Sequence, residues 1–372
     1  MQAIGNYDVI SKLATGGMGE VYLAKQRGPV AFSRDVVLKK LHPSFTNDPH
    51  FVEMFINEAK LCATLTHPNI IHIYELFEDD GYVMAMEYVR GGTVLRLLRT
   101  CAKAGNALPY GPALRIAIGV CEALEHAYNA PDEYGTPRHI VHRDVSPSNV
   151  LVSYDGQVKL ADFGVAKAID VNMTQGTSVK GKYGYLSPEQ LRCHPLDQRS
   201  DLFSLGVVLW EMTTGRALFQ RDNDVAMMYA LVEEAIPKPS DRVAGYPPEL
   251  EAVVMKALAR DRDARYASAS ELANDLRRIA TDRGWDIDAP ALSQLVRDQV
   301  PDDQVAFGRI GSDKFTGAET PMPRETSESY AAVEIDTPAM RRPTHRKALA
   351  VTTGVMVLLT ILFWALIVPR LV

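Results

Sequence analysis

The segment HRDVSPSN, residues 142–149, sets one carboxylate, Asp144, among polar residues beside a strand-like sequence rich in β-branched residues. Two interpretations fit this segment. It could be a surface turn with an ordinary Arg–Asp ion pair, because proline and serine are common in loops. It could also hold Asp144 in place for chemistry. Taken alone, the segment favours the surface turn, so the decision depends on residues elsewhere in the chain.

Three other motifs suit the chemistry of phosphate groups. TGGMG, residues 15–19, is a glycine-rich turn between two strand-like segments, and glycine allows backbone N–H groups to approach phosphate closely. Lys39, in the strand-like VVLK, has an ammonium group that could reach phosphates, and Asp162, in ADFG, offers a carboxylate for Mg²⁺. A hairpin or a solvent-facing lysine would explain single motifs. The order and spacing of all of them are specific.

Strand-like sequence comes first in the chain, and helical sequence follows. Strands are predicted at 7–14, 20–26 and 35–41, a helix at 49–65, and two strands around an Asp-Gly turn within 70–89. From residue 93 to residue 282, several segments have the helical spacing of apolar residues. A β-rich small lobe followed by a larger helical lobe would place a ligand between the lobes.

The composition is that of a globular protein in a reducing compartment. The chain has 372 residues and is 47% hydrophobic, enough for a sizeable core and two lobes. Its cysteines are far apart, which argues against a zinc site and a disulfide framework: Cys62, Cys101, Cys121 and Cys193. The net charge of -6 gives no electrostatic support for a nucleic-acid partner. The N-terminal sequence has no signal-peptide pattern.

An apolar segment near the end of the sequence predicts a membrane span. Residues 348–368 contain no charge and no proline, and a bilayer-spanning helix needs about 20 apolar residues. A buried core helix is the alternative. Four basic residues precede the segment (Arg341, Arg342, Arg346 and Lys347), whereas only Arg370 follows it. The positive-inside rule therefore predicts a single-pass protein of the inner cell membrane, cytoplasmic before residue 348 and with its C-terminus outside.

In this order, the motifs resemble those of the protein kinase family, specifically the bacterial Ser/Thr kinases of eukaryotic type. The resemblance covers residues 7–280 and rests on GGMGEVY (16–22), VVLK (36–39), NEAKL (57–61), HPNI (67–70), HRDVSPSN (142–149), DFG (162–164), SPEQ (187–190), SDLFSLGVVLWEM (200–212) and ARYASASEL (264–272). It implies an α+β, bilobal protein kinase fold with a β-rich small lobe and a helical large lobe. ATP and Mg²⁺, or Mn²⁺ in its place, would be the cofactors, and Ser and Thr hydroxyl groups of proteins the acceptors.

The resemblance and the composition together divide the chain. The predicted parts are a small lobe at 1–89, a large lobe at 90–285, a flexible linker at 286–347, a transmembrane helix at 348–368 and an external tail at 369–372. Within the linker, residues 289–300 predict one short amphipathic helix, with Leu292, Leu295, Val296 and Val300 on one face.

The resemblance also implies roles for single residues. Asp144 would orient the substrate hydroxyl and accept its proton, while Lys39, paired with Glu58, would hold the α- and β-phosphates. Asn149 and Asp162 would bind Mg²⁺. Other nucleotide-binding positions would be Ala14, Thr15, Gly16, Gly17, Met18, Gly19, Val21, Val37, Glu87 and Val89, with Met86 guarding the back pocket. Structural roles are implied for Asp201, which would brace the catalytic loop, and for an ion pair between Glu189 and Arg265.

Arg143 precedes the catalytic aspartate, and in kinases with this arginine it commonly pairs with a phosphorylated residue of the activation loop. The candidates for autophosphorylation here are Thr174, Thr177 and Ser178. If one copy of the chain phosphorylates another, the chain would form a homodimer, and a second copy would be one of its partners.

Three positions depart from the family pattern. Ala14 replaces the first glycine of the loop, and Val37 stands where alanine usually faces adenine. The third departure concerns catalysis, because Ser/Thr kinases usually carry lysine two residues after the catalytic aspartate, where this chain has Ser146. Before SPE, Lys182 stands where the family has threonine. We hypothesise that Lys182 supplies the missing cation; the alternative is a solvent-facing lysine in an impaired enzyme.

Two classes of function remain open. One is an active, membrane-tethered Ser/Thr kinase. The other is a pseudokinase scaffold that binds nucleotide or partners without transfer, weakened by Ser146. The full set of Lys39, Glu58, Asp144, Asn149 and Asp162 favours the active kinase. Tyrosine specificity is disfavoured, because the Ala-Ala-Arg or Arg-Ala-Ala run usual in tyrosine kinases is absent after Asp144.

Overall fold

The structure of the chain, a computed structural model, describes residues 3–16, 19–29, 33–163 and 183–300. All of these residues belong to one unit of the chain, Met1–Thr320, and they are described here by themselves.

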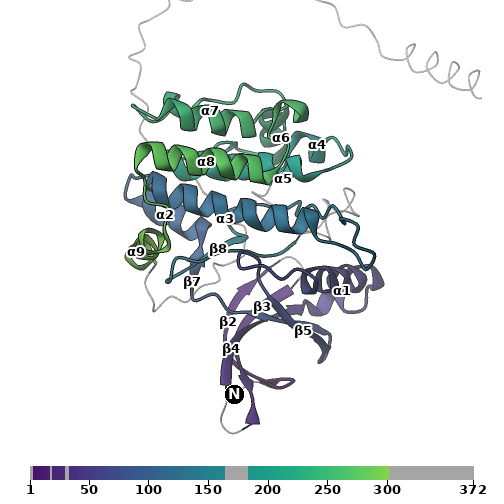
Figure 1. Ribbon diagram of the computed structural model, residues 1–372. Coiled ribbons are helices and arrows are strands. Elements are labelled where there is room, and N and C mark those ends of the chain that lie inside the picture. The colour runs from purple at the N-terminus through teal and green to yellow at the C-terminus, as the bar shows by residue number, and fades with distance from the viewer. Residues whose placement is uncertain (1–2, 17–18, 30–32, 164–182, 301–372) are drawn as a thin grey trace, which may run out of the picture. The chain divides into compact units, whose positions relative to one another are not determined.

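A curved sheet of six antiparallel strands and one helix form the small lobe (Figure 1). In spatial order the strands are β1 (Ala3–Ile4), β2 (Tyr7–Thr15), β3 (Gly19–Arg27), β4 (Ser33–Leu41), β6 (Tyr82–Glu87) and β5 (Ile73–Glu78). The predicted Asp-Gly turn lies in the three-residue connection of β5 to β6, and Asp80 and Gly81 both have positive φ, at 48° and 105°.

Helix α1 (Pro49–Ala63) packs against β5 and β6. It begins where the sequence provides a cap, because the Asp48 side chain accepts a hydrogen bond from the His50 N–H at 3.0 Å and Pro49 suits the first helical position. Its buried face includes Phe55, Glu58 and Cys62, so the carboxylate of Glu58 points toward the core of the lobe.

The large lobe consists mainly of helices, and it includes a small three-stranded sheet on the side that faces the small lobe (Figure 1). The sheet consists of β7 (Gly91–Thr93), β8 (Val150–Ser153) and β9 (Val158–Leu160). The helices are α2 (Val94–Lys103), α3 (Tyr110–Asn129), α4 (Pro188–Leu191), α5 (Gln198–Thr214), α6 (Asp224–Val232), α7 (Pro248–Ala257), α8 (Ala269–Arg283) and α9 (Ala289–Gln299). Helix α3 packs along α8 and α5, and α5 is buried on all sides, which explains its apolar sequence.

One hydrophobic cluster runs through both lobes and joins them. Backbone contacts add to this junction: Ile70 forms a parallel bridge with Leu160 of β9, and the Leu160 N–H donates to the Asn69 carbonyl at 2.8 Å. The strand that leads to Asp162 is therefore fixed to the segment that follows α1.

Helix α9 corrects the predicted boundary between the kinase lobes and the linker. The short amphipathic helix is present, but it is not part of a flexible segment, because Leu292, Val296 and Val300 are fully buried in the main hydrophobic cluster. The backbone of residues 286–289 also lies close to two glycines of the large lobe. A Cβ on Gly156 would lie 2.0 Å from the Ala289 carbonyl oxygen, and a Cβ on Gly111 would lie 2.1 Å from the Asp286 carbonyl oxygen. Residues 286–300 therefore belong to the folded domain.

Among the described residues, no helix is both long enough and apolar enough to cross a membrane. The span predicted at 348–368 lies outside the described residues.

Candidate active site

Asp144 lies in the loop between α3 and β8, and two backbone hydrogen bonds fix the start of this loop. The carboxylate of Asp201, in the first turn of α5, accepts hydrogen bonds from the N–H groups of His142 and Arg143, both at 2.7 Å. Arg143 has a left-handed backbone (φ 67°), which costs free energy in a residue with a side chain. The bonds to Asp201 help to hold this conformation, so the predicted bracing role of Asp201 is confirmed.

The Asp144 residue itself is held by Asn149 and His142. The side-chain amide of Asn149 donates to the backbone carbonyl of Asp144 at 2.8 Å and to its Oδ2 atom at 3.0 Å. The Asp144 N–H donates to Nδ1 of the buried His142 at 3.2 Å, while Nε2 of His142 lies 3.1 Å from the Ala161 carbonyl oxygen. We therefore place the imidazole proton on Nε2. The loop thus presents one carboxylate in a defined position.

The ammonium group of Lys39 joins three elements. Its Nζ atom lies 2.7 Å from Oε1 of Glu58 on α1 and 2.9 Å from Oδ1 of Asp162, two residues after β9. Burial opposes the charge of Lys39, but the carboxylates of Asp162 and Glu58 outweigh it and hold the pKa of Lys39 above its ordinary value. Burial also raises the pKa of Glu58, against the effect of Lys39. Because one ammonium lies between two carboxylates, we take Lys39 as charged.

The apolar residues predicted to contact the nucleotide share one buried region. Ala14, Val21, Val37 and Val89 come from β2, β3, β4 and the segment after β6, and all four belong to the cluster that crosses both lobes. Val21 lies directly opposite Lys39 in the pairing of β3 with β4. The sheet thus places the apolar surface next to the ammonium group.

The glycine-rich turn between β2 and β3 is described at its two ends. Thr15 is exposed, and the Gly16 N–H donates to the Gly19 carbonyl at 2.8 Å, which closes the turn. A Cβ on Gly19 would lie 2.5 Å from the Lys40 carbonyl oxygen, so glycine is required at this position by the neighbouring strand as well.

The Glu87 side chain has a structural partner that the sequence did not reveal. Its carboxylate lies 2.8 Å from Nζ of Lys159, which is nearly buried on β9, and it also accepts a hydrogen bond from the His72 N–H at 3.2 Å. The Glu87 N–H in turn donates to the His72 carbonyl at 2.8 Å. Any contact of Glu87 with adenine would therefore use its carbonyl oxygen.

The side chains of Asn149 and Asp162 provide oxygen ligands of the kind that Mg²⁺ prefers. Among the described residues, no group of three or more His, Cys, Asp and Glu side chains could hold a metal ion alone. This donor set fits Mg²⁺, which is usually bound by one or two protein carboxylates together with substrate phosphates and water.

Ser146 stands where the family has lysine, and its side chain is buried. Its hydroxyl lies 2.9 Å from the hydroxyl of Ser148, and Ser148 in turn lies 3.4 Å from Oδ1 of Asn149. The Ser146 hydroxyl thus has its hydrogen-bond partner inside the loop. The residues proposed to act with it or to be phosphorylated lie outside the described residues: Lys182, Thr174, Thr177 and Ser178, as do Gly17 and Met18 of the glycine-rich loop.

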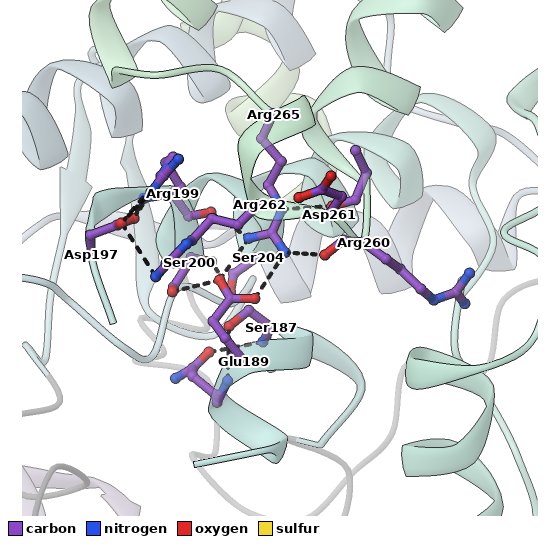
Figure 2. A network of polar contacts seen from close by, with 12 residues as sticks. Ser187, Glu189, Asp197, Arg199, Ser200, Ser204, Arg260, Asp261, Arg262 and Arg265 are labelled. Atoms are coloured by element: carbon purple, nitrogen blue, oxygen red, sulfur yellow. Dashed lines mark hydrogen bonds and ion pairs between the residues drawn. The ribbon is translucent and has the colours of Figure 1, made fainter. Parts of the chain in front are cut away.

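The predicted ion pair between Glu189 and Arg265 is formed (Figure 2), and both residues are buried. Two hydrogen bonds of 2.7 and 2.8 Å join the guanidinium to the carboxylate, and the Ser200 hydroxyl donates to Glu189 at 2.6 Å. Burial alone would raise the pKa of Glu189, but the hydrogen bonds from Arg265 and Ser200 outweigh it and hold this pKa below its ordinary value. The pair fixes α4 against the segment that precedes α8.

Gln190 is a second residue that the sequence reasoning missed. Its side-chain oxygen accepts a hydrogen bond from the Ser187 N–H at the cap of α4 (2.8 Å), and its side-chain nitrogen donates to the Arg143 carbonyl in the loop that carries Asp144 (2.9 Å). The first contact has a local signal, because the Ser-x-x-Gln spacing of SPEQ is a capping-box pattern. The second contact joins residues that are 47 positions apart, and no pattern in the sequence indicates it.

Comparison with known proteins identifies the family. The model of the protein kinase domain matches residues 7–276, and the chain therefore belongs to the protein kinase family. Tyrosine-protein kinase MasK from Myxococcus xanthus is 40% identical over 319 residues, which is 85% of this chain and 48% of MasK. Serine/threonine-protein kinase PknB from Mycobacterium tuberculosis is 37% identical over 282 residues, which is 73% of this chain and 42% of PknB.

A solved structure supports the same fold. The kinase domain of Mycobacterium tuberculosis PknI is 27% identical, with a TM-score of 0.57 over 74% of this chain and 97% of that domain. The chain spans about half or less of the length of the curated relatives named here. An alignment with MasK over 85% of this chain must include α9, whereas the family model ends at residue 276.

Proposed function

We propose that this chain transfers the γ-phosphoryl group of ATP to Ser and Thr hydroxyl groups of protein substrates. The single observation that carries the proposal is the geometry of the Asp144 carboxylate, held by Asn149 at 3.0 Å in a loop braced by Asp201. The ion pair of Lys39 with Glu58, at 2.7 Å, supports it. A scaffold that only bound partners would not require this arrangement.

In the proposed reaction the substrate oxygen attacks the γ-phosphorus, the bond from that phosphorus to the β,γ-bridging oxygen breaks, and ADP leaves. Asp144 orients the attacking hydroxyl and accepts its proton, and Lys39 binds the phosphate oxygens that stay with ADP. When bound by Asn149 and Asp162, Mg²⁺ would offset phosphate charge. The role of the chain is mainly to position groups and stabilise charge.

The test is phosphoamino acid analysis of protein substrate incubated with the chain and Mg-ATP. Phosphoserine and phosphothreonine are expected. If the chain binds nucleotide with normal affinity but incorporates no phosphate into any protein, the pseudokinase scaffold is the correct function.

Transfer to tyrosine is a second candidate, although the sequence pattern disfavours it. Two observations favour it: the relative that aligns with 85% of this chain is named a tyrosine-protein kinase, and Ser146 replaces the lysine usual in Ser/Thr kinases. The same analysis decides, since phosphotyrosine as the main product would replace the Ser/Thr assignment.

Lys182 is proposed to supply the cation that Ser146 lacks. Lys182→Ala should then lower turnover by about 10–1,000-fold, the range for loss of one electrostatic contact to the transition state. A Ser146→Lys/Lys182→Thr double variant should keep more activity than Lys182→Ala alone. Near-normal activity of Lys182→Ala would show that the lysine has no catalytic role.

Autophosphorylation of the activation loop is part of the proposal, with a homodimer as the route in trans. The Nε atom of Arg143 is buried and has no hydrogen-bond partner among the described residues. This is expected of a side chain that binds a phosphate group only after the activation loop is phosphorylated. Alanine at Thr174, Thr177 and Ser178 together should abolish activation. Unchanged activity of that triple variant would disprove it.

We also propose that residues 348–368 tether the domain to the cytoplasmic face of the cell membrane, on the basis of their length and the basic residues before them. Deleting 348–372 should release the protein from the membrane fraction. If the truncated chain remains in that fraction, this segment is not the anchor.

A further inference from the structure

Gln190 uses the two ends of its side-chain amide for two different purposes. Its Oε1 atom accepts a hydrogen bond from the Ser187 N–H at 2.8 Å, and the Gln190 N–H donates to the Ser187 hydroxyl at 3.3 Å, which completes a capping box at the start of α4. A capping box is made equally well by Glu and by Gln, because it needs only the oxygen of the side chain. The cap alone therefore does not explain a glutamine.

The Nε2 atom of Gln190 donates to the carbonyl oxygen of Arg143 at 2.9 Å. This carbonyl belongs to the peptide group between Arg143 and Asp144, and the N–H of the same peptide group donates to Nδ1 of His142 at 3.2 Å. Gln190 and His142 thus hold opposite edges of the peptide plane from which the Asp144 side chain starts.

The backbone at this peptide needs such support. Arg143 is in the left-handed region, at φ 67°, where a residue with a side chain is strained and remains only if its surroundings hold it there. Asp201 holds the N–H groups of His142 and Arg143, before the peptide plane. The side-chain amide of Gln190 holds the carbonyl of this peptide group.

We infer that Gln190 is a positioning residue for Asp144, and that it couples α4, which follows the activation loop in the sequence, to the loop that carries Asp144. This inference rests on the proposed phosphoryl transfer. A shift of α4 would move the Arg143–Asp144 peptide, and with it the carboxylate that receives the substrate proton. Misplacement of a catalytic group by about 1 Å can lower a rate by about 100-fold.

Two variants of the full chain separate this role from the capping role. Gln190→Glu keeps an oxygen for the Ser187 N–H but sets a second oxygen, which cannot donate, against the Arg143 carbonyl. Ser187→Ala removes the hydroxyl from the cap and leaves the contact of Gln190 with Arg143 in place. We expect Gln190→Glu to lower kcat by about 10–100-fold with KM for ATP nearly unchanged, and Ser187→Ala to change kcat by less than about two-fold.

Hydrogen exchange of the backbone provides a measurement that does not require activity. The amides of residues 142–145 should exchange faster in Gln190→Glu than in the unchanged chain, and not in Ser187→Ala. If kcat and exchange in Gln190→Glu both equal those of the unchanged chain, or if Ser187→Ala shows the same losses, Gln190 is only a cap. If exchange rises as expected while even the unchanged chain transfers no phosphate, the contact holds the loop and the proposed function is wrong.

Discussion

Replacing Leu292 with alanine should lower the free energy of unfolding of the folded domain by about 3 kcal/mol. Leu292 is fully buried, in contact with the main cluster, and α9 lies beyond the end of the family match at residue 276. The loss combines the transfer of the removed carbon atoms with the cavity that they leave, and alanine itself favours the helix.

The matched control lies on the opposite face of the same helix. Gln294 is exposed, so Gln294→Ala should change stability by no more than about 0.5 kcal/mol. For a domain of this size, the Leu292 variant should melt about 6 °C below the unchanged chain.

Thermal unfolding followed by intrinsic fluorescence provides the assay, because Trp285 lies just before α9 and stacks on Tyr110, with 4.6 Å between ring centroids. A chain ending at residue 300 should retain the stability of the domain, and one ending at 285 should lose it. Equal melting temperatures for Leu292→Ala and Gln294→Ala would refute the claim that α9 is part of the folded domain.

Three further predictions follow from buried charges. Lys39→Ala should lower kcat/KM by about 100-fold or more in a steady-state assay, because the phosphate oxygens lose their cation. Arg265→Met should cost about 3–5 kcal/mol in chemical denaturation, because it leaves the Glu189 carboxylate buried without its ion-pair partner; a loss below about 1 kcal/mol would contradict this. Burial raises the pKa of Glu211 to about 7 from 4.5, so the folded chain binds this proton more tightly and stability falls as pH rises through that window. Glu211→Gln should therefore reduce the fall in Tm between about pH 5 and pH 8, though not abolish it, because burial also raises the pKa of Asp201 to about 7; an unchanged slope would count against it.

Local patterns predicted much of the fold. Strands β2 to β6, the Asp-Gly turn at Asp80–Gly81 and helix α1 lie where periodicity and turn residues indicated them, and α2, α3, α5, α7 and α8 fall within the predicted helical region, whereas β1 was not predicted. These features depend on neighbours in the sequence, which a single chain displays directly.

Contacts between distant residues could not be predicted in the same way. The sequence predicted an apolar face with Leu292 and Val296 on it, but it placed this helix in a flexible linker and did not indicate that the helix packs against the large lobe. The pair of Glu87 with Lys159 joins residues 72 positions apart, and either residue alone reads as a solvent-facing charge. The ion pairs of Lys39 with Glu58 and of Glu189 with Arg265 were predicted only through the resemblance to a family, not through spacing.

The most direct test of phosphoryl transfer by Asp144 compares the full chain with its Asp144→Asn variant. Both proteins are incubated with Mg²⁺ and γ-labelled ATP, and labelled protein is measured over time, with nucleotide affinity measured in parallel. We predict that the variant binds nucleotide normally and transfers phosphate about 100–10,000-fold more slowly, since it lacks the group that accepts the proton. Equal rates of transfer by the two proteins would contradict the assignment of Asp144 as the catalytic base.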